Sequence, residues 1–204
     1  MSAGEWDERY AAGERIWSGQ PNQALVAEVS ELAPGRALDV GCGEGADAVW
    51  LARRGWDVTA LDVSSVALGR AQQHATEAGV AVRWLLAGLT EAARTDAALA
   101  EGGFDLVSAQ YPALLHAGDH EPERALLAAV APGGILLVVH HLIDAEHARE
   151  SGLDPADYVS PGDVANLLDD RWLLEVHEER PRHVVGGAGA HHTTDIVVRA
   201  RRLR

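Results

Sequence analysis

The chain is short of cysteine and of long apolar segments. Its 204 residues include one cysteine, Cys42, so an internal disulfide is excluded and a reducing compartment is favoured. No apolar run has the length needed to cross a bilayer. The first residues are acidic and lack the apolar stretch of a signal peptide. We therefore predict a cytoplasmic protein with no membrane partner, forming one domain over residues 1–204.

Positive charge is also scarce. Lys and Arg total 17 against 31 Asp and Glu, a formal net charge of −14. A phosphate-rich partner would be repelled at long range. The one basic cluster lies at the end of the chain and is better explained as a solvated strand terminus: Arg199, Arg201, Arg202 and Arg204. We therefore predict a small-molecule partner, no nucleic acid partner, and a monomer or homodimer.

A glycine-rich turn is the most informative stretch. An apolar segment, residues 36–40, leads into Gly41, Gly43 and Gly45, and a helical pattern over residues 46–54 follows at once. Glycine permits positive φ and lets the backbone approach a ligand without a Cβ in the way. A helix that begins there directs unpaired N–H groups and a positive dipole end toward the same place. This pattern predicts a nucleotide site at the carboxyl end of a first strand.

Asp39 narrows the choice of nucleotide. The spacing Gly41-x-Gly43-x-x-Ala46 fits the dinucleotide pattern, with Asp62 near the distance expected for a ribose-binding acid, so a nicotinamide-dependent oxidoreductase is one alternative. However, a buried acid is costly unless it is hydrogen-bonded, and a carboxylate facing a pyrophosphate would repel it. Asp39 suits a ligand that carries an ammonium or a sulfonium.

Two motifs together suggest a family. The run Asp39-x-Gly41-x-Gly43-x-Gly45, followed by residues 58–64 (VTALDVS), resembles the first two motifs of the class I S-adenosylmethionine (SAM) dependent methyltransferases. The resemblance covers nearly the whole chain. It implies a Rossmann-like, doubly wound α/β fold, with a seven-stranded, mostly parallel sheet, an antiparallel last strand and helices on both faces. The ends of the chain more narrowly resemble the tellurite-resistance and thiopurine methyltransferases.

The resemblance also implies a reaction. A methyl group would pass from SAM to a small-molecule acceptor by in-line displacement, leaving S-adenosylhomocysteine. The acceptor atom would be a thiol, a chalcogen, a hydroxyl or an amine. A SAM-binding protein without catalysis is a second alternative, because motifs do not fix acceptor-site residues. A nucleic acid methyltransferase is disfavoured by the net charge, and by Gln110-Tyr111-Pro112-Ala113 in place of the Asn/Asp-Pro-Pro-aromatic motif of DNA amino-methylating enzymes.

Hydrophobic periodicity predicts the elements of such a fold. Strands are predicted over residues 36–40, 57–61, 80–86, 104–110, 135–139, 172–177 and 195–201, and helices over residues 21–32, 46–54, 66–78, 123–130 and 164–168. Residues 1–33 are predicted to form a helical lid and residues 34–204 the core. The irregular residues 142–163 lie where members of this family vary a substrate lid.

The predicted cofactor residues follow the family pattern. Asp62 would accept both ribose hydroxyls, although it could instead cap the next helix. Gly88 stands where the family often has an adenine-binding Asp, so the backbone N–H of Leu89 and the side chains of Val63 and Leu89 would hold the ring. The full predicted set is Arg9, Tyr10, Trp17, Asp39, Gly41, Cys42, Gly43, Asp62, Val63, Gly88, Leu89 and Gln110.

The lid residues of this set lie near the start of the chain. In the resembled family, this segment folds over the bound cofactor, so Arg9, Tyr10 and Trp17 would contact the methionine end and exclude water. The alternative is an N-terminal helix that packs its Trp side chains on the core.

The predicted catalytic residues are His116, Arg182 and His183. A histidine with a near-neutral pKa could take a proton from an acceptor thiol or hydroxyl, and Arg182 could hold an anionic acceptor. In the tellurite-resistance branch a His-Arg pair in the final hairpin is thought to face the acceptor, and here the order is Arg182-His183. A structural role is the alternative for each of the three.

Ten histidines raise the question of a metal. Two clusters draw attention, one made of His141, Asp144 and His147, and one made of His191, His192 and Asp195. Neither has the spacing of a standard metal motif. We predict no functional metal.

Overall fold

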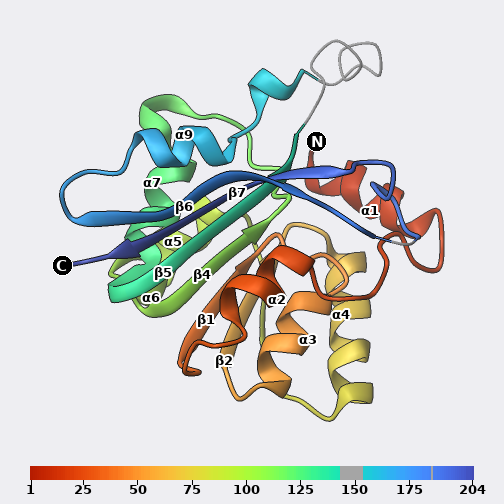
Figure 1. Ribbon diagram of the computed structural model, residues 1–204. Coiled ribbons are helices and arrows are strands. Elements are labelled where there is room, and N and C mark those ends of the chain that lie inside the picture. Colours follow the sequence, from red (N-terminus) through yellow and green to blue (C-terminus); the bar gives the residue numbers. More distant parts are fainter. Residues whose placement is uncertain (143–153, 185) are drawn as a thin grey trace.

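The computed structural model describes residues 1–142, 154–184 and 186–204, and is built on a single seven-stranded sheet (Figure 1). The strand order is β3-β2-β1-β4-β5-β7-β6. The strands are β1 (Arg36–Val40), β2 (Asp57–Asp62), β3 (Arg83–Leu86), β4 (Phe104–Gln110), β5 (Val130–His141), β6 (Trp172–Pro181) and β7 (Thr194–Arg202). The helices are α1 (Ala3–Ala11), α2 (Gln23–Val29), α3 (Ala46–Arg53), α4 (Ser65–Ala78), α5 (Leu89–Thr95), α6 (Ala97–Ala100), α7 (Glu121–Ala129) and α9 (Pro161–Asn166), with 3₁₀ turns at Gly118–His120 and Pro155–Asp157.

The direction of the strands confirms the predicted fold class. β1 pairs in parallel with β2 and β4, and the parallel pairing continues to β3 on one side and β5 on the other. β7 runs antiparallel to both of its neighbours, β5 and β6. The chain order reverses between β1 and β4, and open α/β sheets bind ligands outside the carboxyl ends of the strands at such a point.

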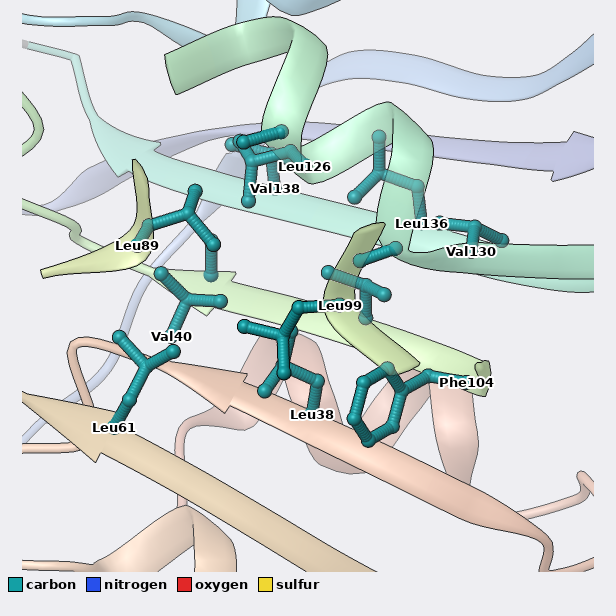
Figure 2. Packing of buried hydrophobic residues seen from close by; sticks show 14 of the residues in the cluster. Leu38, Val40, Leu61, Leu89, Leu99, Phe104, Leu126, Val130, Leu136 and Val138 are labelled. Carbon is teal, nitrogen blue, oxygen red and sulfur yellow. The ribbon is translucent and has the colours of Figure 1, made fainter. Parts of the chain in front are cut away.

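Helices cover both faces of the sheet. Figure 1 shows α2, α3 and α4 on one face, and α5, α6, α7 and α9 on the other. On the second face, Leu99 of α6 and Leu126 of α7 pack with Leu38, Phe104 and Leu136 of the strands (Figure 2). On the first face, α2 and α3 bury apolar side chains against Leu106 and Leu137. Because both faces are covered, the central strands are apolar almost throughout.

Some element boundaries differ from those predicted. β3 begins at Arg83 rather than residue 80, whereas β5 extends to His141, and β6 continues to Pro181. Helix α9 begins at Pro161 because Ser160 and Asp163 form a capping box. The short helices α5 and α6 were not predicted. Each is shorter than two and a half turns, too short for a clear apolar period.

Among the described helices, none combines the length and the apolar character that a membrane crossing requires.

Leu136 tests the packing between the sheet and α7. Its side chain is 0% exposed in β5, so Leu136→Ala should lower the free energy of unfolding by about 2–5 kcal/mol through lost burial and a residual cavity. Leu173→Ala is the control, because that side chain is 50% exposed on β6 and should cost about 0.5 kcal/mol or less. Urea denaturation followed by circular dichroism measures both. Equal losses in the two variants would contradict this core.

Candidate cofactor and acceptor site

Polar side chains gather at the carboxyl end of one face of the sheet. Along β4, Leu106 belongs to the apolar core of that face, and alternate residues place Ser108 and Gln110 on the same side. Asp39 of β1 lies opposite Ser108 in the ladder, and Asp62 ends β2 on the same face. All of these polar residues are buried. The face therefore changes from apolar to polar where the strands meet the glycine bend, residues 41–45.

The glycine bend uses conformations that favour glycine. The φ angles of Gly41, Gly43 and Gly45 are 70°, 53° and 81°. The N–H groups of Gly41 and Cys42 donate to the Leu61 carbonyl at 2.9 and 3.0 Å. A Cβ on Gly45 would lie 2.7 Å from that of Ala71 in α4, so α3 and α4 can approach closely only because this side chain is missing.

Asp62 holds the bend to the second strand. Its carboxylate accepts the Gly43 N–H at 2.8 Å and the Ser64 N–H at 2.9 Å, one on each oxygen. Burial raises the pKa of Asp62, and these hydrogen bonds oppose that rise. Ser64, not Asp62, caps α4. Each carboxylate oxygen retains a further lone pair that two ribose hydroxyls could use.

Asp39 and Gln110 each present an unpaired acceptor. Asp39 is 2% exposed, and among the described residues its Oδ2 and Gln110 Oε1 have no hydrogen-bond partner. The Gln110 amide group donates to Ser108 Oγ at 3.0 Å. Burial, then the charges of Asp47 and Asp62, raise the pKa of Asp39 well above its usual value. Two buried acceptors in an acidic environment fit a cationic donor group and would oppose a phosphate.

Asp47, in the first turn of α3, was not predicted as a site residue. Asn22 donates its backbone N–H and its side-chain amide to the two carboxylate oxygens, both at 2.7 Å. Burial nevertheless raises the pKa of Asp47 to about 6. The pair ties the start of α2 to the glycine bend across 25 residues of sequence, a contact without a local sequence signal.

A cavity of about 360 Å³ opens beside Asp62. Its lining comes from α1, the ends of β2 and β3 and the starts of α4 and α5: Ala3, Asp7, Val63, Ser65, Leu86, Ala87, Gly88 and Glu91. Val63 and Gly88, two of the predicted cofactor residues, thus line one cavity. Leu86, which is 61% exposed, adds an apolar wall that was not predicted.

Leu89 departs from the prediction. Its side chain is buried in the core on the other face of the sheet, against α7 and β5 (Figure 2), so it cannot sandwich a ring in this cavity. Its backbone N–H lies in the first turn of α5, outside the pairing within the helix. Only that N–H remains a candidate contact.

Tyr10 and Trp17 lie over the glycine bend. The Trp17 indole N–H donates to Tyr10 Oη at 3.0 Å. A Cβ on Gly43 would lie 2.9 Å from Tyr10 Oη and 3.3 Å from Trp17 Nε1, so the two side chains contact the bend directly. Burial raises the pKa of Tyr10, which therefore keeps its proton.

The remaining predicted residues of this region differ in position. Arg9 is exposed, with its guanidinium 5.2 and 5.8 Å from the ring centres of Trp6 and Trp17, so it lies on the outer side of the lid rather than at the bend. Cys42 is half-buried, and burial followed by the charges of Asp39 and Asp62 raises the pKa of its thiol. The structure thus gives Cys42 a packing role as a neutral thiol.

Glu44 connects the lid to the bend. Its carboxylate accepts the backbone N–H groups of Ile16 and Trp17 at 3.2 and 3.1 Å, and pairs with Arg70 at 2.8 Å. Arg70 also donates to the carbonyls of Tyr10 and Gly13. Nothing in the sequence identified Glu44 beyond its place between two glycines.

Asp7 fixes the other end of the lid. It accepts the hydroxyls of Ser64 and Ser65 at 2.6 and 3.0 Å and the Val66 N–H at 3.1 Å. Helix α1 is thereby held on the first turn of α4, at the rim of the cavity.

His116 lies on the side of α7 and α9. Its Nδ1 is 3.0 Å from Oε1 of Glu123, which is 0% exposed, and its Nε2 is 3.7 Å from Asp163 Oδ2. The 3₁₀ turn before α7 includes Asp119 and His120, both with positive φ. A buried carboxylate therefore orients an exposed imidazole, an arrangement that the sequence did not reveal.

Arg182 and His183 form hydrogen bonds that hold the last hairpin in place. Arg182 is buried and donates to the carbonyls of Gly189 and His192 at 2.8 and 3.2 Å and to Tyr111 Oη at 3.2 Å. The backbone of His183 pairs with the side chain of Gln23 in α2, and its own side chain is exposed. These contacts agree with the structural alternative for both residues.

Comparison with known proteins assigns a family to this site. Residues 37–134 match a family model described as a methyltransferase domain. An uncharacterized methyltransferase of Mycobacterium tuberculosis is 39% identical over 150 residues, which cover 73% of this chain and 71% of the relative. The chain belongs to the SAM-dependent methyltransferases. Alignment with a ubiquinone biosynthesis O-methyltransferase of Pectobacterium carotovorum gives 36% identity over 175 residues, covering 76% of this chain and 71% of that protein.

A solved structure supports the same fold. The N-methyltransferase NodS of Bradyrhizobium japonicum, in complex with S-adenosylhomocysteine, superposes with a TM-score of 0.73 at 20% identity, covering 100% of both chains. The present chain, as a SAM-dependent methyltransferase, is an enzyme whose cofactor, SAM, supplies an activated methyl group on a sulfonium. The unpaired acceptors of Asp39 and Gln110 fit such a cation, whereas a nicotinamide dinucleotide would place phosphate against the acidic group.

Metal binding has no support in the part of the chain that the structure covers. Residues 1–142, 154–184 and 186–204 contain no group of three His, Cys, Asp or Glu arranged to hold an ion. Asp144 and His147 of the first predicted cluster lie outside the described residues. In the second cluster, His192 stacks on His141 rather than converging with Asp195 on one point.

The Glu44 contacts predict how firmly the lid is held. Glu44→Gln removes the charge that Arg70 and the two N–H groups share, and hydrogen bonds to charged groups contribute about 1.5–3 kcal/mol. We expect the backbone amides of residues 10–18 to exchange hydrogen about ten times faster or more. Glu101→Gln, an exposed change at the end of α6, is the control. Unchanged exchange in Glu44→Gln would mean that other contacts hold the lid.

Proposed function

We propose that this methyltransferase moves the methyl group of SAM to a small-molecule acceptor by in-line displacement. The observation that carries the proposal is the pair of unpaired acceptors, Asp39 Oδ2 and Gln110 Oε1, buried beside the glycine bend. These groups would bind the cationic methionine end of the cofactor. Asp62 would take the ribose, and Val63, Gly88 and Leu86 would enclose the adenine.

The acceptor is proposed to lie under the lid and the last hairpin. The Ala188 N–H donates to the Ile16 carbonyl at 2.8 Å, and a Cβ on Gly187 would lie 2.8 Å from the Trp17 carbonyl carbon, so the two segments meet above the sheet. Contact between the lid and the last hairpin leaves less room for a polymer than for a small molecule. The net charge of −14 also opposes a nucleic acid. The Pectobacterium relative is named for O-methylation in ubiquinone biosynthesis, which supports a small acceptor.

The protein's main contribution to such a reaction is alignment. The donor is already activated, and holding the nucleophile about 3–3.5 Å from the methyl carbon can lower the barrier by on the order of 7–11 kcal/mol. The lid would also exclude water, with which a sulfonium reacts wastefully. His116, supported by Glu123, and the hairpin residues Arg182 and His183 stay predictions for the acceptor side.

The finer assignments come from the sequence. Membership of the tellurite-resistance and thiopurine branch is a hypothesis based on the two ends of the chain. One domain with residues 1–33 as its lid, a cytoplasmic location and a monomer or homodimer are likewise predictions.

Binding of SAM is the direct test of the proposal. Isothermal titration should give a 1:1 complex, and incubation of labelled SAM with a panel of phenols, thiols and amines should give a methylated product. Neither heat nor a thermal shift on adding SAM would refute the proposal. Binding without turnover of any acceptor would favour a SAM-binding protein without catalysis.

Binding of SAM should be coupled to the release of a proton from Asp39. Its pKa is raised in the free protein, and a cation at its unpaired oxygen favours the ionised form, so binding should release a proton at pH values below the raised pKa. Affinity should therefore increase as pH rises toward that pKa and level off above it. Titrations at pH 6 and 8, each in two buffers of different ionisation enthalpy, measure the released protons.

The variant Asp39→Asn should bind SAM about 10–100-fold more weakly, as expected for one lost charged hydrogen bond, and release fewer protons. Asp47 and Asp62, whose pKa values are also raised, would account for the protons that remain. Asp57→Asn, at the exposed start of β2, is the control. Equal affinity in the two variants would remove Asp39 from the site.

A further inference from the structure

His141 and Asp195 form a pair that the predicted catalytic set did not include. They lie directly opposite each other in the antiparallel ladder of β5 and β7. His141 Nδ1 is 3.1 Å from Asp195 Oδ1, and the His141 side chain is 13% exposed. The second oxygen, Oδ2, accepts the Tyr111 hydroxyl at 2.8 Å and lies 3.8 Å from Arg182 Nε. Each carboxylate oxygen therefore has a donor.

This geometry fixes which imidazole nitrogen carries a proton. A carboxylate only accepts, so Nδ1 must donate and, in the neutral ring, Nε2 keeps its lone pair. Burial, and then the adjacent carboxylate, raise the pKa of Tyr111, which therefore remains a donor to Asp195 and does not compete for the proton. Asp195 thus orients His141 with a basic nitrogen directed away from the carboxylate.

Aromatic rings hold the imidazole plane. The His141 ring stacks on Tyr111 with centroids 4.2 Å apart and on His192 at 4.1 Å. Burial, and then neighbouring positive charge, lower the pKa of His140 and bring that of His192 to about 4, so both rings are neutral near pH 7. Tyr111 itself has a φ of 53°, a left-handed conformation that is strained for a non-glycine residue and is often found at functional sites.

The pair lies at the same end of the sheet as the cofactor residues. Gln110 is opposite Val139 in the parallel ladder of β4 and β5, and His141 is two residues further along, on the same face. His141 is therefore one strand away from Gln110 and about 7 Å beyond it along the strand. His116, by contrast, contacts α7 and α9 on the other face of the sheet.

We propose that His141 is the general base that takes a proton from the substrate, and that the atom which receives the methyl group is a hydroxyl oxygen. This inference rests on the proposed function. The hydroxyl proton passes to His141 Nε2 while the oxygen forms a bond to the methyl carbon; the carbon–sulfur bond breaks and its electron pair stays on sulfur. The imidazolium then returns its proton to water. Asp195 and Tyr111 are positioning residues, since they act through His141. A thiolate would need no such base, which is why the pair points to a hydroxyl acceptor.

Gly189 provides a way to probe Nε2. A Cβ on Gly189 would lie 3.3 Å from His141 Nε2, so the missing side chain leaves that nitrogen accessible from the hairpin. Gly186, in the same hairpin, has an almost identical φ of 79° against 81°, but an added Cβ there meets no atom of the described residues within 4 Å. Gly186→Ala is thus a matched control that introduces the same backbone strain without approaching the ring.

Nuclear magnetic resonance tests the pair without any methyl acceptor. In long-range ¹H–¹⁵N spectra, we expect the neutral form of His141 to carry its proton on Nδ1. Asp195→Asn should increase the Nε2-protonated form, while His177→Gln, an exposed change on β6, should leave the His141 signals unchanged. A neutral His141 ring protonated on Nε2 in the unaltered protein would overturn the proposal.

Turnover tests the hydroxyl assignment. With the panel of phenols, thiols and amines, His141→Gln should reduce methylation of a phenol about 100-fold or more and change SAM affinity less than twofold, while His177→Gln changes neither. Gly189→Ala should slow the phenol reaction at least tenfold relative to Gly186→Ala at equal thermal stability. Methylation of thiols or amines without any phenol, or a phenol rate in His141→Gln equal to the control, would overturn the inference. Loss of SAM binding in the unaltered protein would instead remove the proposed function itself.

Discussion

The buried carboxylates at the end of β1 and β2 determine how this site is built. Burial raises the pKa values of Asp39, Asp47 and Asp62, and the charges of Asp47 and Asp62 further disfavour the ionised form of Asp39. Local donors offset part of it: the Gly43 and Ser64 N–H groups for Asp62, and Asn22 for Asp47. Among the described residues, one oxygen of Asp39 has no donor. In the proposed complex a cationic group would supply the missing interaction, so the acidic residues would favour a positively charged ligand.

The lid depends on this acidic group through the glycine bend. Glu44 accepts N–H groups of Ile16 and Trp17 only because the bend places its carboxylate toward them, and Asn22, at the other end of the lid, is held by Asp47. These hydrogen bonds join the glycine bend to the lid, so a change in the conformation of one would alter the other.

Local sequence patterns predicted the parts of the structure whose causes are local. β1 and β4 have the predicted bounds, and the bend follows from glycines that adopt positive φ. The hydrogen bonds of Glu44, Asp47 and Asp195 were missed because their partners lie 25–84 residues away in the sequence. Leu89 was misjudged for a related reason: α5 was not predicted, and the helix turns that side chain into the core.

The antiparallel direction of β7 explains why Asp195 lies beside His141 at the carboxyl edge of the sheet. A parallel last strand would place its first residues at the amino edge of the sheet, far from the glycine bend. Because β7 is antiparallel to β5, its first residues lie at the carboxyl edge, and Asp195 comes directly opposite His141. β6, antiparallel to β7 and so parallel to β5, ends at the same edge, which brings Arg182, the residue after β6, beside Tyr111 and the hairpin carbonyls. The reversal of β7 therefore adds the carboxylate of Asp195 to an edge that the other strands supply with their carboxyl ends.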